Sequence, residues 1–158
     1  MRVTDLLRVD HQRVHDLFLE AETTPERDRR RELLDMIGEE LEVHAQAEEE
    51  IVYPAFRGVS RRIDDALQGH QHIWRVIGEV RGLDPGAAEF APRLLLLKQA
   101  VLVHVIEEEG GVFLDAATLG HDELERLGRQ VEARKKELRA SMRQRAKRAV
   151  KPAAQKIA

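Results

Sequence analysis

The sequence predicts an all-α protein: an antiparallel up-down four-helix bundle, followed by an additional C-terminal helix and a basic tail. Four stretches carry apolar residues at alternating spacings of three and four, which is the period of the buried stripe of a packed helix. Most prolines and glycines lie between these stretches, and no stretch has the alternating pattern of a strand. We place the bundle in residues 1–118, the fifth helix in 119–141 and the tail in 142–158.

Residues that favour helix ends separate the first two helices. Thr4 can cap a first helix that reaches about residue 21. Thr23 or Thr24, followed by Pro25, can start a second helix, since proline is favoured in the first turn. We expect this second helix to run to about residue 52 and to end at Pro54.

The remaining helices are delimited in the same way. Ser60 can cap a third helix that reaches Arg81, and a fourth is expected over residues 88–109. Acidic residues after Gly120 favour the start of a fifth helix. Apolar residues become sparse from Ser141 onward, so we expect a disordered tail there.

Each of the four apolar stripes contains a histidine where an aliphatic residue is expected, and two of them add a glutamate four residues later. Buried ionisable groups cost free energy unless they are paired or bind a metal. Four antiparallel helices can bring such residues to one level, so the pattern predicts a dimetal site. Imidazole and carboxylate without thiolate suit iron, manganese or zinc. The stripes are Leu7-His11-Val14-Phe18, Leu34-Ile37-Leu41-His44-Glu48, Ile63-Leu67-His70-Trp74-Ile77 and Leu94-Leu97-Val101-His104-Glu108.

The composition excludes several other classes of protein. The chain has no cysteine, which excludes disulfides, iron–sulfur clusters and a cysteine nucleophile. The first ten residues carry four charges and do not form the apolar region of a signal peptide. No apolar run reaches the roughly 20 residues that span a membrane. We therefore expect a cytoplasmic location and no membrane partner.

The charge is distributed unevenly along the chain. Residues 129–158 carry 11 Lys/Arg and 2 Asp/Glu, whereas the whole chain has a net charge of −3. We favour the interpretation that the basic tail either solubilises the protein or folds onto the rest of the chain, which is acidic and which we call the acidic body. The alternative is that it binds the phosphates of a nucleic acid, without base stacking because no aromatic residue accompanies the charges.

Specific motifs in these stripes resemble those of a known family. They are Val9-Asp10-His11, the segment from His44 to Pro54, Gly69-His70 and the segment from His104 to Glu109. Over about residues 3–117 the chain resembles the hemerythrin-like (HHE cation-binding) domains, in particular short single-domain bacterial members. The resemblance implies two iron ions joined by an oxo bridge and by Glu48 and Glu108. It places His11 and His44 on one iron, and His70 and His104 on the other.

The chain departs from the oxygen-carrying hemerythrins at two positions. Those proteins have a further histidine one turn after the position of His70, where this chain has Trp74. They also have an aspartate as the second bridge, whereas this chain has Glu108 four residues after His104. Because Trp74 replaces a histidine, one nitrogen ligand is missing, which leaves a coordination position for water, peroxide or another side chain. This favours reaction with hydrogen peroxide, oxygen or nitric oxide over reversible oxygen transport.

Two further residues are candidates for the metal site. Tyr53 follows Glu48 by five residues, so an ideal helix would turn it about 140° away. It can therefore bind metal only if the helix is distorted, and is otherwise a hydrogen-bonded structural residue. His15, one turn after His11, can be a ligand or contact one, or be structural. We expect the neighbouring glutamates to face solvent or pair with arginine, with Glu107 as a substitute ligand; these are Glu49, Glu50, Glu107 and Glu109.

The resemblance and the departure at Trp74 together suggest a function. We expect a non-haem di-iron protein that decomposes hydrogen peroxide in a catalase-like reaction. The alternative is a protein that binds or senses oxygen, nitric oxide or iron without turnover. The sequence leaves the choice among iron, manganese and zinc open, and it does not indicate an oligomeric state.

Overall fold

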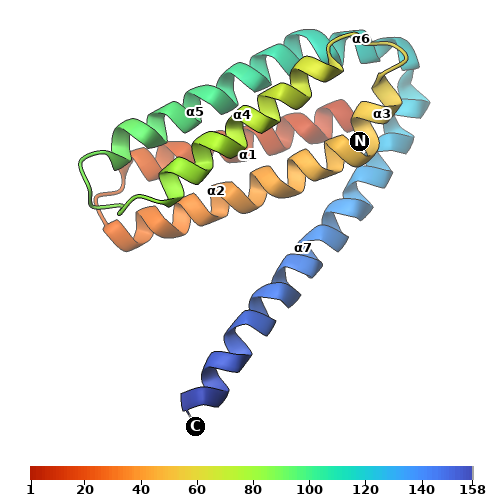
Figure 1. Cartoon of the computed structure of the whole chain (residues 1–158). Helices are drawn as coiled ribbons and strands as arrows, with labels where there is room; N and C mark the ends of the chain where they lie inside the picture. The colour runs from red at the N-terminus through yellow and green to blue at the C-terminus, as the bar shows by residue number, and fades with distance from the viewer. Residues whose placement is uncertain (158) are drawn as a thin grey trace.

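Four long helices form an antiparallel bundle (Figure 1). The computed structural model describes residues 1–157, with the side chains of residues 1–150, and contains no strand in this range. Helix α1 packs against α2 and α5, and α4 packs against α2 and α5, which confirms the predicted bundle. No described helix combines the length and the apolar character needed to cross a lipid bilayer. The four helices are α1 (Val3–Thr23), α2 (Arg27–Ala47), α4 (Ile63–Arg81) and α5 (Phe90–Glu107).

Helices α2 and α5 each continue into a π-helical turn that begins at the glutamate of the apolar stripe. The backbone N–H of Tyr53 donates to the carbonyl of Glu48, and that of Phe113 to Glu108, five residues earlier in each case. Pro54 does not end the second helix as predicted, because it lies in the first turn of α3, where proline is tolerated. The short elements are η1 (Glu48–Val52), α3 (Tyr53–Phe56), η2 (Glu108–Val112), α6 (Phe113–Ala116) and η3 (Ala117–Leu119).

The predicted N-caps are wrong. Thr4 is buried within α1, so packing rather than capping determines its position. The hydroxyl of Thr23 donates to the carbonyl of Leu19, which extends α1 instead of starting α2. Ser60 precedes α4 by three residues, and its Oγ donates to Asp115 at 2.7 Å. Helix α4 nevertheless ends at the predicted residue, Arg81.

A polar layer divides the apolar core of the bundle into two clusters. In α2, Leu41 belongs to one cluster and Ala47 to the other, with His44 between them. Helices α1 and α4 likewise contribute to both clusters, whereas α5 contributes to the first and the following elements η2 and α6 to the second. Large members of the first cluster are Phe18, Leu34, Ile77 and Leu97, and those of the second are Tyr53, Phe56, Phe113 and Leu127. The predicted polar positions therefore lie inside the bundle, with apolar packing on both sides.

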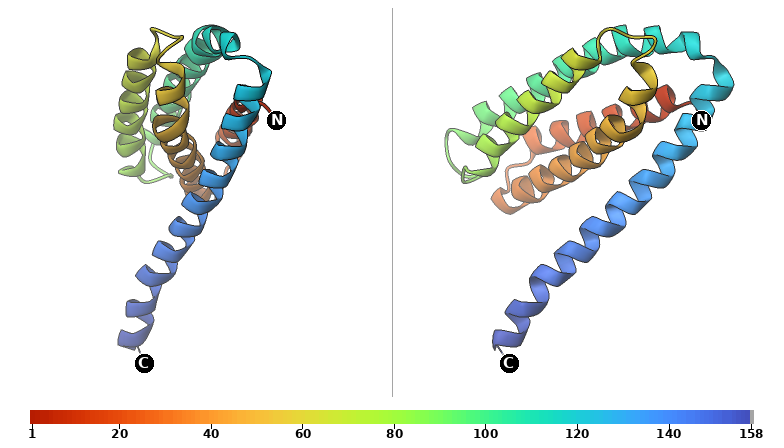
Figure 2. Two further views of the ribbon diagram at one scale, coloured as in Figure 1. Left: turned by 90° about the vertical axis from the view of Figure 1, so that its right-hand side faces the viewer. Right: turned by 45° about the vertical axis from the view of Figure 1, so that its right-hand side comes forward.

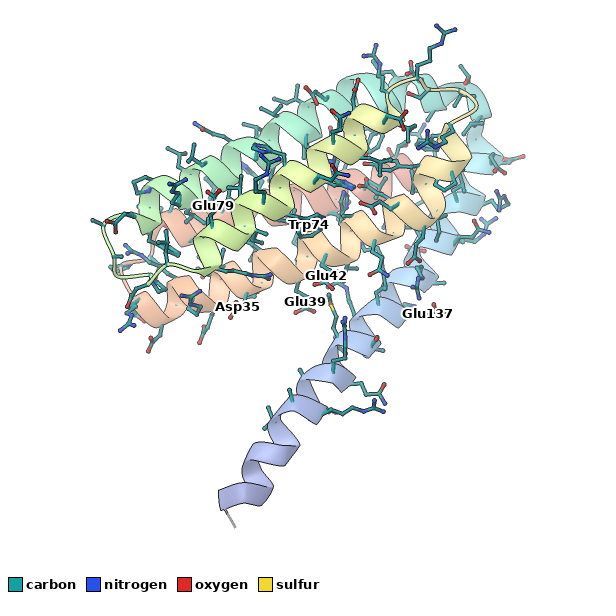
Figure 3. All side chains as sticks on the ribbon, viewed as in Figure 1. Asp35, Glu39, Glu42, Trp74, Glu79 and Glu137 are labelled. Atoms are coloured by element: carbon teal, nitrogen blue, oxygen red, sulfur yellow. The ribbon has the colours of Figure 1, made fainter. Side chains whose placement is uncertain are left out.

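The last helix, α7 (His121–Ile157), packs across α1 and α2 and then leaves the bundle (Figures 1 and 2). The expected helix end near residue 141 is wrong, because Arg, Lys, Gln and Ala have high helix propensity even without an apolar stripe. The first part of the basic segment contacts acidic residues of the bundle, because Arg134 pairs with Glu50 and Arg139 with Glu40. Its Arg145 guanidinium reaches only to 3.8 Å from the Glu42 carboxylate, and Glu39 and Glu42 lie on the side of α2 that faces α7 (Figure 3). Nucleic-acid binding by this segment stays a prediction.

Gly128 allows the close contact between α7 and the start of α1. A β-carbon at this position would overlap the backbone oxygen of Met1 and lie 3.2 Å from the backbone nitrogen of Val3. We expect Gly128→Ala to lower the free energy of unfolding by about 1–3 kcal/mol, measured by urea denaturation. In the control Gly78→Ala, the added β-carbon meets nothing within 4 Å, and the stability should rise by up to about 1 kcal/mol. Unchanged stability of Gly128→Ala would contradict this account of the α7 contact.

Candidate metal centre

The six predicted ligands meet in one buried layer across the bundle. Their donor atoms form two groups, each within 4.8 Å, which share Glu48. Glu48 Oε1 lies 3.1 Å from His44 Nε2, and Glu48 Oε2 lies 3.1 Å from His70 Nε2. The two oxygens of this carboxylate thus face different groups, a geometry suited to bridging two cations. The first group is His11, His44, Glu48 and Glu108, and the second is Glu48, His70 and His104.

The hydrogen bonds on the outer side of the layer direct histidine lone pairs inward. His11 Nδ1 lies 2.7 Å from Glu109 Oε1, and His44 Nδ1 lies 3.1 Å from Asp10 Oδ2. Ionised carboxylates only accept hydrogen bonds, so each Nδ1 carries a proton and each ring turns its Nε2 atom into the layer. These two Nε2 atoms are only 3.2 Å apart. Two lone pairs this close repel each other, so either a proton or a metal cation lies between the two nitrogens.

Three buried atoms of this layer also lack a hydrogen bond within the described part of the chain. They are Glu48 Oε1, His104 Nε2 and Glu108 Oε2. Glu48 Oε1 approaches His44 Nε2 closely, but not in hydrogen-bonding geometry. Buried polar atoms are rarely left unpaired, because their desolvation is then uncompensated. The nitrogen and oxygen donors therefore fit a bound iron, manganese or zinc ion.

The charges in the layer shift pKa values in opposite directions. Burial lowers the pKa of His44, but Glu48 and Asp10 outweigh this effect and raise it to about 10. Burial lowers the pKa of His104 to about 3, so its ring is neutral near pH 7. Burial and the charge of Glu48 raise the pKa of Glu108, whereas the imidazoles lower that of Glu48 despite its burial. The raised pKa of His44 means that the metal-free layer keeps a proton on this ring, and a bound cation would replace that proton.

The π-helical turn brings Tyr53 into the same layer. An i to i+5 hydrogen bond makes five residues complete about one turn, which returns Tyr53 to the face of Glu48. The Tyr53 hydroxyl donates to Glu108 Oε1 at 2.8 Å and lies 3.2 Å from both Glu48 Oε2 and His70 Nε2. Burial, followed by the charges of the two glutamates, raises the pKa of Tyr53. The distortion that the sequence analysis required for Tyr53 is therefore present.

Sequence reasoning missed the carboxylates that support the histidines. Glu49 Oε1 lies 2.8 Å from His70 Nδ1, and Glu109 occupies the same place behind His11. As predicted, Glu49 is exposed, Glu109 lies 3.6 Å from Arg8 and Glu50 pairs with Arg134, but the contacts of Glu49 and Glu109 with the histidines were not predicted. The repeat itself contained the necessary information, because Glu49 and Glu109 each directly follow the glutamate of an apolar stripe. Glu107 is exposed, as predicted.

A buried ion pair joins α7 to the layer. Asp10 accepts hydrogen bonds from Lys135 of α7 and from His44 of α2. Lys135 is only 8% exposed and stands in the apolar stripe of α7 between Val131 and Leu138. Its role was not predicted, although a lysine in such a stripe needs a buried partner.

A small cavity adjoins the four histidines of the layer. Its volume is about 20 Å³, which is room for a molecule about the size of water, and its walls are almost entirely apolar. Trp74, on α4 (Figure 3), forms part of its wall together with Leu41 and Val101. His15 is exposed and lines a separate surface groove of about 450 Å³ beside His11. His15 is therefore not among the residues that converge.

Comparison with known proteins agrees with the fold. The model of the hemerythrin HHE cation-binding domain matches residues 2–116, a range that contains all six converging ligands. The crystal structure of an HHE cation-binding domain-containing protein from Mycobacterium kansasii has a similar fold, with a TM-score of 0.82 and 21% identity over 89% of each chain. A curated relative, a DNA nickase of Nostoc sp., is 30% identical over 115 residues, which are 72% of this chain but 33% of that protein. The chain therefore belongs to the hemerythrin HHE cation-binding domain family.

Proposed function

We propose that this chain is a non-haem di-iron protein that decomposes hydrogen peroxide in a catalase-like reaction. The observation that carries the proposal is the small apolar cavity beside the four inward-facing histidines, with Trp74 in its wall. The oxygen-carrying relatives have a further histidine ligand where this chain has Trp74, so one coordination position is left to a small molecule. His11 and His44 would hold one iron, His70 and His104 the other, with Glu48 and Glu108 as bridges.

The cavity favours a small substrate. Two bound iron ions would supply the two-electron redox chemistry that converts two molecules of hydrogen peroxide into oxygen and two molecules of water. The volume of about 20 Å³ restricts access to molecules of a few atoms. Its apolar wall residues, including Leu41 and Val101, lie beside the four histidines and Asp10.

Tyr53 has two candidate roles at this centre. Its hydroxyl lies within hydrogen-bonding distance of both proposed bridging glutamates and of His70. Tyr53 can hold a proton next to the bridge and donate it as peroxide is reduced. Alternatively, its oxygen would help to hold the iron on the His70 side. Both roles use the position that the π-helical turn creates.

The alternative function is the binding or sensing of oxygen, nitric oxide or iron without turnover. The same cavity has room for a diatomic gas, so the two functions differ in reactivity and not in geometry. The rate of peroxide decomposition separates them.

The buried layer predicts that metal binding stabilises the fold. Zinc at about 100 times its dissociation constant should raise the midpoint of thermal unfolding of metal-free protein by about 5–10 °C, because only the folded state binds it tightly. His44→Ala/Glu48→Ala should abolish this shift, whereas the control His72→Ala, at an exposed residue of α4, should retain it. An equal shift in the double variant would place the metal elsewhere.

Iron-loaded protein should release oxygen from hydrogen peroxide faster than the same concentration of free iron, as measured with an oxygen electrode. Glu48→Ala/Glu108→Ala should lose both the iron and the activity. The control Glu50→Ala should keep both, because Glu50 pairs with Arg134 outside the layer. Two irons per chain without oxygen release would contradict the catalase-like reaction and support the sensing function.

Tyr53→Phe separates the two roles of the tyrosine. Phe113 holds the corresponding place after Glu108, so the ring of phenylalanine is compatible with this position of the turn. If Tyr53 binds iron, the variant should lose a visible phenolate-to-iron absorption band. If Tyr53 only donates a proton, the spectrum and the iron content should persist while the rate of oxygen release falls. Wild-type spectrum, iron content and rate together would contradict both roles.

A further inference from the structure

We propose that the two metal positions are not equivalent, and that the position at His11 and His44 binds its ion more tightly than the position at His70 and His104. We call them the first and the second position. The inference rests on the proposed dinuclear site. It assigns an order of loading: one ion fills the first position, and the second position holds the more readily exchanged ion.

Both histidines of the first position are supported by carboxylates. Glu109 contacts His11 Nδ1 at 2.7 Å, and Asp10 contacts His44 Nδ1 at 3.1 Å. Lys135 neutralises the charge of Asp10 from the other side and is itself buried. Such contacts fix the orientation of each ring and make its inner nitrogen a stronger donor.

Among the residues that the structure describes, the second position has this support at one histidine only. Glu49 contacts His70 Nδ1 at 2.8 Å. The two halves of the bundle correspond residue by residue, so that His70 matches His11 and Gly69 matches Asp10. A β-carbon on Gly69 would lie 2.7 Å from His104 Nδ1, which leaves no room for a side chain between α4 and this ring. Helix α4 therefore cannot support His104 in the way that α1 supports His44.

The bridging carboxylates show the same asymmetry. Glu108 Oε2 lies 3.3 Å from His11 Nε2 but 3.9 Å from His104 Nε2. The donor atoms of the first position accordingly include both glutamates within 4.8 Å of one another, whereas those of the second include only Glu48. The distances of the glutamates and the carboxylates behind the histidines thus both favour tighter binding at the first position.

The difference in affinity can be measured by adding Co²⁺ to metal-free protein without oxygen. We expect two binding steps, separated about 10–100-fold in affinity, because the loss of a carboxylate behind a histidine typically has an effect of this size. The visible cobalt spectrum follows the steps, and native mass spectrometry counts the ions. The separation should persist in Tyr53→Phe, which removes the contribution of the phenol to the second position.

Single substitutions assign the steps. Asp10→Asn should weaken the tight step by about 10–100-fold, and Glu49→Gln should weaken only the second step. The matched controls are Asp16→Asn, on the exposed side of α1, and Glu50→Gln. His104→Ala should keep one tightly bound cobalt, whereas His44→Ala should keep only the weak site. If Asp10→Asn fails to fold because Lys135 loses its partner, the two histidine variants still assign the steps.

Failure of the inference differs from failure of the proposed function. Two cobalt ions that bind with equal affinity would contradict the inequivalence but leave the dinuclear site intact. Loss of the tight step in His104→Ala would likewise contradict the inequivalence and leave the dinuclear site intact. Binding of fewer than two ions by wild-type protein would contradict the dinuclear site itself.

Discussion

The structure depends on a layer of nitrogen and oxygen donor atoms that lie buried in the bundle. The layer holds too few protons to give each of these atoms a hydrogen bond. The inward Nε2 atoms of His11 and His44 lie 3.2 Å apart, and Glu48 and Glu108 meet in the same apolar surroundings. A cation resolves this conflict, and the apolar clusters on both sides make the conflict severe by excluding water. Helix packing, π-helical turns and carboxylate support can all be understood as ways of holding these atoms in place.

The bundle and its six donor residues could be predicted from the sequence because both follow from periodicity. His44 stands in an aliphatic stripe, which indicates that it is buried. The same pattern recurs at His104, which indicates that the two residues share one site. The family match spans the residues that the stripes indicate. The ends of helices were less predictable, because Thr4 is held by packing and Thr23 bonds back to its own helix.

The residues that the sequence did not identify are those whose role depends on a non-local neighbour. Glu49 looks like a surface residue until α4 places His70 beside it, and Lys135 is explained only by Asp10, 125 positions earlier. Tyr53 reaches the layer through a distorted helix, as the spacing from Glu48 requires, but no local sequence signal locates the π-helical turn that supplies the distortion. The straight continuation of α7 shows that helix propensity can extend a helix beyond its packing stripe.

Anomalous diffraction at the iron absorption edge, from crystals of iron-loaded protein, tests the central claim most directly. The account predicts two peaks in the layer between the apolar clusters, one beside His11 and His44 and the other beside His70 and His104. Glu48 should contact both peaks. A single peak elsewhere, or no peak in this layer, would contradict the dinuclear centre and with it the explanation of the buried donor atoms.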